Sequence, residues 1–338
     1  MKSTSTSTSM SKSTQGISEI LKTTTKADEL LPWVEKYRPK NLDQIIDHSE
    51  KITVLRKMID NKQLPHLLLF GLPGSGKTSI VLAAAREMYG DNYKNYIMEL
   101  NASDHRGIDI VRTVIPEFVR VKSDKLRLII LDEVDAMTQD AQSALRCVME
   151  KSVKNCRFCL ICNNITKIIP GVSSRCARMR FGVLKSTEVR KKIDTIVEAE
   201  KVKISPDAVD ALLALNKDLR QVLNTLQCLH FIKDEEITSE DIYEYIGQPS
   251  PSDVNDFYKN LTGPGGFNKV YPKLSEMLKE NRWSFLSMID YLCQRVINDK
   301  KMKEAKRGSI LRGLSEIEYR VVNGRDSDLQ LASLIALF

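Results

Sequence analysis

The sequence predicts a parallel α/β domain whose sheet is covered by helices on both faces, followed by two helical domains. The first half of the chain alternates apolar, strand-like runs with helical patterns, which is the order of a parallel sheet. A glycine-rich motif at 71–78 separates the first apolar run from the first helical pattern. Residues 253–338 offer helical patterns and no convincing strand. The predicted fold class is therefore α/β, with all-helical domains after it.

Five short apolar segments are predicted to form the sheet. They lie at 64–70, 96–100, 126–131, 156–162 and 179–181. Helical patterns stand between them, at 79–88, 107–120 and 138–151. After residue 182 the pattern changes to short amphipathic helices, at 187–201, 206–215, 218–232 and 238–246. About five further helices are expected beyond the Pro-containing break at 247–251.

These patterns divide the chain into four segments. Residues 1–30 form a Ser/Thr-rich tail that we expect to be disordered, and residues 31–185 form the α/β domain. Residues 186–248 form a small helical domain and residues 249–338 a larger one. The tail lacks the apolar core of a secretory signal, which predicts an intracellular protein, and a weak organelle-targeting role stays open. No stretch approaches the roughly 20 apolar residues of a membrane span, so we expect no membrane partner.

The net charge of +7 is unevenly distributed. Lys and Arg exceed Asp and Glu within residues 31–185, whereas residues 186–338 carry a small acidic excess. A basic excess in one domain suits a polyanionic partner there. An ordinary solvated surface explains the same excess, and charge alone does not separate the two.

The seven cysteines are expected to be free thiols of an intracellular protein. Cys156, Cys159 and Cys162 have a spacing that resembles a cluster-binding run. They fall on a predicted strand, however, where a spacing of three places neighbouring cysteines on opposite faces. We therefore interpret them as core residues and predict no metal site here.

The glycine-rich motif has the pattern of a phosphate-binding P-loop, G-x-x-x-x-G-K-[ST], at every fixed position. Its glycines let backbone N–H groups converge on one point, to which the following helix N-terminus adds a partial positive charge. Lys77 is placed to reach the β- and γ-phosphates, and the Thr78 hydroxyl to hold Mg²⁺. An ordinary glycine-rich turn is the alternative. The predicted nucleotide-binding residues of the motif are Gly71, Leu72, Pro73, Gly74, Ser75, Gly76, Lys77, Thr78 and Ser79.

A pair of acids ends the buried strand predicted at 126–131. Asp132 is expected to bind Mg²⁺ through the water shell of the metal, and Glu133 to orient and polarise the attacking water. The alternative is an acidic turn that caps the next helix, a role that suits Asp135 better than the pair. Together with the P-loop, these acids predict hydrolysis of ATP rather than phosphate binding alone.

Further motifs along the chain resemble those of one particular family of ATPases. A P-loop domain followed by a small helical lid resembles the AAA+ ATPases, and the chain is similar throughout residues 31–338 to the small subunits of replication factor C, the eukaryotic clamp loader. The lid corresponds to residues 186–248 and the helical collar, through which subunits associate, to 249–338. The motifs that carry the resemblance are LPWVEKYRP at 31–39, ELNASD at 99–104, RGID at 106–109, AMTQDAQSALR at 136–146, SRC at 174–176 and DLR at 218–220.

The resemblance implies roles for three polar residues. Asn163 corresponds to sensor 1, which polarises the γ-phosphate and the lytic water, although the adjacent Asn164 is an alternative and a strand-end Asn is also a common turn former. Arg220 corresponds to sensor 2 in the lid, the alternative being a surface arginine. Arg175 corresponds to an arginine finger that acts in trans on the ATP of a neighbouring subunit, rather than a structural arginine.

The resemblance also places the segment before the P-loop over the adenine of ATP. Tyr37, Arg38 and Pro39 are the expected contacts, with Ile45 and Ile46 as an apolar wall. The alternative is a Pro-containing lead-in without a ligand role.

For partners, the resemblance implies homologous subunits in a hetero-pentamer, the sliding clamp PCNA, primer–template DNA and a nuclear location. Arg106, Arg112 and Lys151 are the candidate DNA-backbone contacts, although solvated helix charges explain them equally well. His105 and Cys147 depart from the family pattern in the same region and make those contacts less certain. Two other functions stay open: another AAA+ DNA-dependent motor or initiator, and an ATP-binding scaffold that does not hydrolyse.

Overall fold

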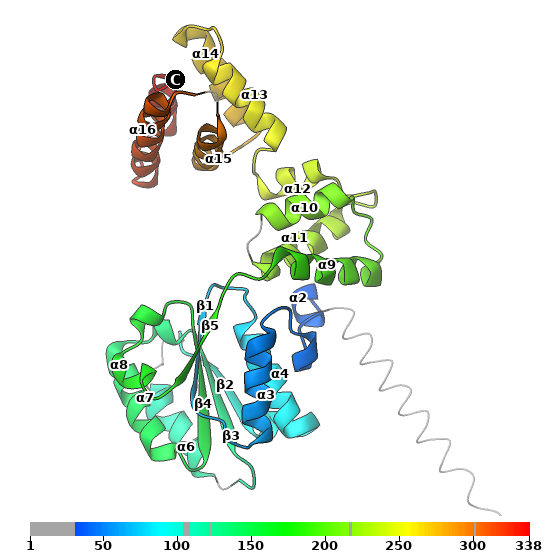
Figure 1. Ribbon diagram of the computed structural model, residues 1–338, viewed down its shortest axis with the longest axis vertical. Coiled ribbons are helices and arrows are strands. Elements are labelled where there is room, and N and C mark those ends of the chain that lie inside the picture. Colours follow the sequence, from blue (N-terminus) through cyan, green and yellow to red (C-terminus); the bar gives the residue numbers. More distant parts are fainter. Residues whose placement is uncertain (1–30, 104–108, 122, 216–217, 301) are drawn as a thin grey trace, which may run out of the picture. The chain divides into compact units, whose positions relative to one another are not determined.

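The computed structural model describes residues 31–338 apart from 104–108, 122, 216–217 and 301. The chain forms two compact units (Figure 1). Of the described residues, the first unit contains those within 31–201 and 215–227, and the second contains those within 202–214 and 228–338. The tail at 1–30 lies outside the described residues, and the four-segment organisation stays a prediction.

A five-stranded sheet forms the centre of the first unit, with the strand order β2-β3-β4-β1-β5. All neighbouring strands are parallel, so that Leu68 of β1 is paired with Leu160 on one side and Arg178 on the other. The first strand begins three residues later than predicted, because Pro65 has no N–H to donate to a ladder. The predicted parallel sheet is confirmed. Its strands are β1 (Leu67–Gly71), β2 (Ile97–Asn101), β3 (Arg127–Asp132), β4 (Cys156–Cys162) and β5 (Ala177–Phe181).

Helices cover both faces of this sheet (Figure 1). Leu67 and Leu69 belong to the core under α3 and α4, whereas Leu68 belongs to the core under α6 and α7. Because both faces are buried, β1 is apolar at successive positions rather than at alternate ones. The elements on these faces are α3 (Ser49–Asp60), α4 (Lys77–Tyr89) and η2 (Gly90–Asn95), and α6 (Ile115–Arg120), η4 (Val134–Ala136), α7 (Gln139–Ser152), η5 (Ile165–Lys167) and α8 (Pro170–Ser173).

The helix predicted at 107–120 is not one regular α-helix. It contains a π-helical turn, η3 (Ile110–Val114), before α6. Pro116 has no N–H to donate to the carbonyl of Arg112. The backbone is therefore not held in a regular α-helical turn here, and a wider turn is accommodated.

The cysteines of β4 have the predicted alternation. Cys159 packs in the core on the α3–α4 face, whereas Cys156 and Cys162 pack in the core on the opposite face. Burial raises the pKa of the Cys162 thiol to about 12. These are core thiols rather than reactive ones.

The chain enters the first unit through α2 (Trp33–Lys36) and η1 (Leu42–Gln44). The backbone N–H of Trp33 donates to Gln227 Oε1 over 3.0 Å, and Lys36 pairs with Glu200 over 2.6 Å. Tyr37 also donates its hydroxyl hydrogen to Glu200. These contacts fasten the segment before the P-loop to α9 (Ser186–Glu200) and to the middle of α11 (Leu219–Ile232).

The second unit is helical. Residues 253–338 form helices without a strand among their described positions, as predicted. Phe257, Leu274, Met288 and Leu314 belong to one buried core. No helix in the described ranges is long and apolar enough to cross a membrane. The helices are α10 (Pro206–Leu215), α12 (Ser239–Ile246), α13 (Pro251–Thr262), α14 (Phe267–Glu280), α15 (Phe285–Asn298), α16 (Glu304–Val322) and α17 (Ser327–Ile335).

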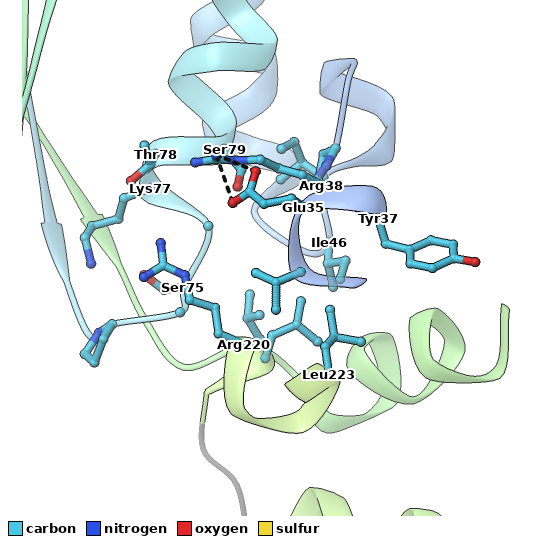
Figure 2. A pocket seen from close by; sticks show the side chains of 18 of the residues that line it. Glu35, Tyr37, Arg38, Ile46, Ser75, Lys77, Thr78, Ser79, Arg220 and Leu223 are labelled. Carbon is cyan, nitrogen blue, oxygen red and sulfur yellow. Dashed lines mark hydrogen bonds and ion pairs between the residues drawn. The ribbon is translucent and has the colours of Figure 1, made fainter. Parts of the chain in front are cut away.

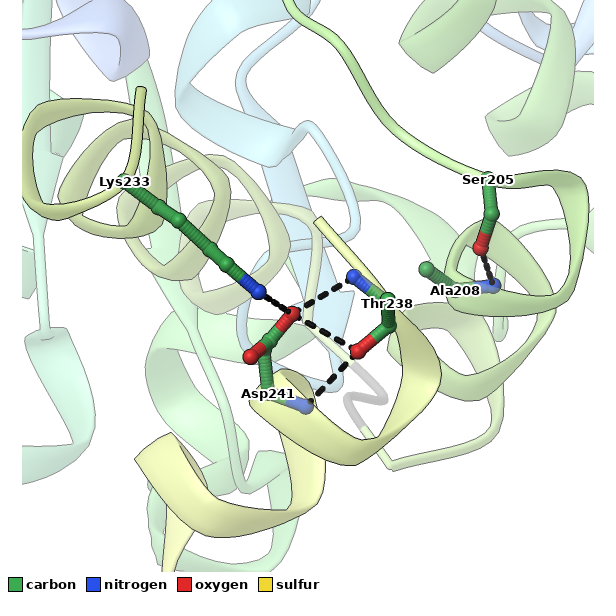
Figure 3. Close-up of polar contacts among 5 residues, drawn as sticks. All are labelled: Ser205, Ala208, Lys233, Thr238 and Asp241. Atoms are coloured by element: carbon green, nitrogen blue, oxygen red, sulfur yellow. Dashed lines mark hydrogen bonds and ion pairs between the residues drawn. The ribbon is translucent and has the colours of Figure 1, made fainter. Parts of the chain in front are cut away.

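The predicted helix starts in this unit have side-chain caps (Figure 3). The Ser205 hydroxyl accepts the N–H of Ala208 at the start of α10, over 3.2 Å. At α12, Thr238 and Asp241 form a reciprocal capping box, in which the carboxylate accepts the Thr238 N–H over 2.7 Å. Burial opposes ionisation of Asp241, but hydrogen bonds from Lys233 and Thr238 outweigh it and hold its pKa below the usual value.

Candidate nucleotide-binding site

A cavity of about 240 Å³ lies above the carboxyl ends of β1, β3 and β4. Its wall combines the segment before the P-loop, the P-loop itself, the ends of β3 and β4, and parts of α9 and α11. Parallel α/β sheets place their ligand sites at this end of the strands. In Figure 2 the side chains of Lys77 and Tyr37 lie at opposite ends of the group drawn.

The Lys77 ammonium is buried at one end of this cavity. It donates to the carbonyl oxygens of Gly71 and Leu72, over 2.9 and 2.8 Å, and to Asn163 Oδ1 over 3.0 Å. Burial lowers the pKa of Lys77, and the nearby Asp132 opposes that effect. All three partners are uncharged oxygens, so a phosphate oxygen competes well for this ammonium.

The P-loop backbone brings the N-terminus of α4 to the same point. Lys77 is the first residue of that helix, and Gly76 before it is left-handed, with φ +87°. The helix therefore directs its unpaired N–H groups and its positive dipole end toward the place that Lys77 faces. Gly71 permits a close approach at the base of the loop, because a Cβ there would lie 1.9 Å from the Phe181 carbonyl oxygen.

Thr78 and Asp132 meet beside the loop. The Thr78 hydroxyl donates to Asp132 Oδ2 over 2.7 Å, and the backbone N–H of Glu133 donates to Asp132 Oδ1 over 2.8 Å. Glu133 has left-handed backbone angles, with φ +56°, and its exposed side chain lines the cavity. An adjacent hydroxyl and carboxylate are the oxygen ligands that Mg²⁺ prefers, so these residues fit the predicted metal.

The structure separates the two asparagines that follow β4. Asn163 lines the cavity and contacts Lys77, whereas the side chain of Asn164 accepts the N–H of Thr166 over 2.9 Å and caps η5. Asp135 accepts the backbone N–H groups of both asparagines, over 3.3 and 3.0 Å. The cap of α7 comes from Thr138 and not from Asp135. Asp135 is thus a positioning residue that the sequence did not reveal.

The other end of the cavity is more apolar. Tyr37, Arg38, Pro39 and the pair Ile45 and Ile46 line it, and α11 adds apolar side chains. Glu35 pairs with Arg38 over 3.1 Å (Figure 2). The predicted set lacked Glu35 and five further lining residues, and the four-residue spacing of the two leucines of α11 was a usable sequence signal. These additional residues are Val34, Leu184, Lys192, Leu219 and Leu223.

Arg220 lies in the cavity wall on the first turn of α11. Its backbone N–H donates to Asp218 Oδ1 over 2.8 Å, and a Cβ on Gly74 would lie 1.7 Å from the same oxygen. The DLR segment thus directly abuts the P-loop. Gly71 and Leu72 are the two motif residues outside the lining, and they act through their carbonyl oxygens.

The remaining predicted residues that the structure describes lie outside this cavity. Arg175 follows α8, where its guanidinium pairs with Glu150 over 2.6 Å and donates to the Gly171 carbonyl over 2.7 Å. Arg112 and Lys151 are exposed, in η3 and near the end of α7. Arg106 lies outside the described residues.

The fold and the site define a P-loop nucleotide-binding domain of the AAA type. The family described as "ATPase family associated with various cellular activities" matches residues 67–183. Among solved structures, the RuvB Holliday junction branch migration motor of Thermotoga maritima matches with a TM-score of 0.51 and 17% identity, over 72% of this chain and 88% of that chain. At that identity the likeness shows the fold alone.

Longer matches define the family more narrowly. The replication factor C C-terminal domain matches residues 249–337. Replication factor C subunit 3 of Schizosaccharomyces pombe is 42% identical over 92% of this chain and 91% of its own length, and subunit 5 of Homo sapiens is 41% identical over 91% of each. The chain belongs to the replication factor C family of clamp-loader ATPase subunits. Subunit 3 of Saccharomyces cerevisiae is 40% identical, over 92% of this chain and 93% of its own length.

Proposed function

We propose that this chain is an ATP-hydrolysing subunit of a clamp loader that opens a sliding clamp and loads it onto primer–template DNA. The observation that supports hydrolysis best is the convergence of the P-loop and two strand ends on one cavity. Lys77 contacts Asn163 there, and Thr78 contacts Asp132. Glu133 lines the same cavity, in the position of a residue that orients water.

In this proposal each residue has one task on ATP. Lys77 and the N-terminus of α4 hold the phosphates, while Asn163 senses the γ-phosphate with its amide. Thr78 and Asp132 would hold Mg²⁺, which neutralises phosphate charge when bound. Glu133 orients the attacking water, and Arg220 approaches from α11 as a second sensor. Tyr37, Arg38, Pro39 and Ile45 surround the base.

We further propose that Arg175 acts in trans. Its position outside the cavity supports this, because a residue that served its own ATP would line that cavity. The guanidinium is partly exposed, with 39% of its side chain accessible, and its charge is permanent. Arg175 then acts on the ATP site of a neighbouring subunit in a hetero-pentamer.

The other partners belong to the same proposal. The sliding clamp PCNA and primer–template DNA are the substrates of such an assembly, and the nucleus is its location. Exposed Arg112 and Lys151 suit contacts with the DNA backbone, which read charge and shape rather than sequence.

The deciding experiment measures ATP hydrolysis by the purified chain, first alone and then with homologous subunits, clamp and primed DNA. We expect a low rate alone and a strong rise when all components are present. A complex that contains Lys77→Ala in this chain should lose ATP binding at this site. Fast turnover by the isolated chain, unaffected by the clamp, would instead indicate a self-assembling AAA+ motor.

A further inference from the structure

We propose that Lys192 of α9 donates a hydrogen bond to the nucleoside part of the bound nucleotide. The proposal rests on the function proposed above and adds a contact on the lid helix, at the end of the cavity opposite to Lys77. The acceptor is a base nitrogen or a ribose hydroxyl oxygen, two atoms with the same hydrogen-bond chemistry.

The position of Lys192 on α9 supports a role inside the cavity. Val189, Ile193 and Ile196 form the buried face of this helix, and Lys192 lies three residues from the first and four from the last. Side chains at these spacings share one side of a helix. Lys192 is half-buried and lines the cavity, whereas its neighbour Lys191 is 71% exposed.

The nearest aromatic ring places the ammonium at the nucleoside end. Lys192 Nζ lies 5.9 Å from the centre of the Tyr37 ring, and Tyr37 lines the base end of the cavity. Such a distance permits a cation–π contact and leaves the N–H groups able to find another acceptor. Lys77, which faces the phosphates, belongs to the other end.

The charge of Lys192 is poorly compensated. Across the described ranges, no carboxylate lies within 4.0 Å of its ammonium, whereas Lys36 and Lys191 pair with Glu200 and Glu188. Burial also lowers the pKa of Lys192. A half-buried ammonium without a carboxylate is expected to gain an acceptor when a ligand enters the cavity.

The test measures dissociation constants of ATP and ADP for Lys192→Met and for Lys191→Met. Both changes remove one charge from the same helix, but only the first removes a donor from the cavity. We expect Lys192→Met to raise the dissociation constants of ATP and ADP equally, by roughly tenfold, which is the effect of losing a charge-assisted hydrogen bond. Lys191→Met should bind like the parent, and Lys192→Arg should keep most of the affinity.

A second comparison identifies the acceptor. If the effect of Lys192→Met disappears with 2′,3′-dideoxy-ADP, the acceptor is a ribose hydroxyl; if it persists, the acceptor is the base. As a direct readout, acetylation of the parent chain followed by mass spectrometry should show that ADP protects Lys192 and leaves Lys191 reactive. The melting temperature of Lys192→Met without nucleotide should equal that of the parent, which excludes a purely structural effect.

Three results would overturn the proposal. One is unchanged affinity in Lys192→Met, and another is an equal loss in Lys191→Met. The third is a larger loss for ATP than for ADP, which would assign the ammonium to the phosphates. A parent chain that binds neither nucleotide would overturn the proposed function itself.

Discussion

At the scale of single residues, Asn163 and Asn164 show that a shift of one residue along the chain changes what a side chain contacts. Their side chains are identical, yet the first contacts Lys77 and the second caps a short helix. Only the parallel register of β4 decides which amide faces the P-loop, with Cys162 opposite Phe70. The sequence left both asparagines as candidates because register is not visible in a run of apolar residues.

Replacing each asparagine with alanine should give different results. Asn163→Ala should lower the ATP hydrolysis rate at this chain's site in the assembled complex by about a hundredfold while ATP still binds, because in the proposed function its amide acts on the reacting phosphate. Asn164→Ala should lower the free energy of unfolding by about 1 kcal/mol through loss of a cap and leave the rate unchanged. Steady-state rates and urea denaturation measure the two effects, and equal rates in both variants would contradict the assignment.

His66 should make stability depend on pH. Burial, together with the nearby Arg157, lowers its pKa to about 4, and its Nδ1 accepts the N–H of Phe158 over 3.1 Å. Below the unfolded pKa of about 6.5, the unfolded chain binds a proton that the folded chain excludes. The free energy of unfolding should therefore fall by about 1 kcal/mol per pH unit from pH 6.5 down to the folded pKa.

The control for this pH dependence is His66→Asn, which keeps an acceptor near Phe158 and removes the titrating ring. Urea denaturation of both proteins at pH 7, 6 and 5 should show a shallower loss in the variant. Burial lowers the pKa of His48 as well, so some loss in the same direction should remain. An identical slope would show that His66 does not carry the effect.

At the scale of elements, the end of β1 determines whether the P-loop fits its sheet. Gly71 has φ +145°, and a Cβ there would lie 1.9 Å from the Phe181 carbonyl oxygen on β5. Gly71→Ala should therefore destabilise the protein by roughly 4 kcal/mol, since the backbone of β5 must move. Gly182→Ala is the matched control, because nothing lies within 4 Å of a Cβ at that position. Denaturant midpoints that fall equally would contradict this explanation.

Elements were more predictable than their contacts. Strands β1, β3 and β4 are buried on both faces and were visible as apolar runs, whereas β5 alternates exposed arginines with buried Met179 and Phe181. The predicted start of β1 was three residues too early, because Pro65 interrupts strand pairing. The helix predicted at 107–120 contains a π-helical turn that the sequence pattern did not indicate. Lys192 was missed because its place in the cavity depends on α9 packing against the chain entry, through Lys36 and Glu200. Such contacts between distant segments leave no periodic signal.

At the scale of the whole molecule, the proposed trans role of Arg175 predicts which ATP site loses activity when this arginine is removed. In a complex containing Arg175→Ala, the rate at the neighbouring subunit's site should fall by about 10³-fold or more, the usual value of an arginine finger. ATP affinity of this chain itself should not change, because Arg175 lies outside its own cavity. Single-turnover hydrolysis and nucleotide binding separate the two quantities.

Arg180→Ala is the control for that experiment, since it removes another exposed arginine from β5 of the same domain. The complex with this variant should keep the parent rate. Loss of ATP affinity in Arg175→Ala would show that the arginine acts on its own subunit or on folding.

The strand order has a consequence for synthesis on the ribosome. β1 lies between β4 and β5, so the strand that carries the P-loop has neither neighbour when it leaves the exit tunnel. β5 ends about 110 residues later, which at 5–20 residues per second corresponds to roughly 5–20 s of translation. Throughout that interval Leu67, Leu68 and Leu69 lack at least one strand partner, and such an incompletely paired apolar strand is a typical ligand for chaperones that bind nascent chains.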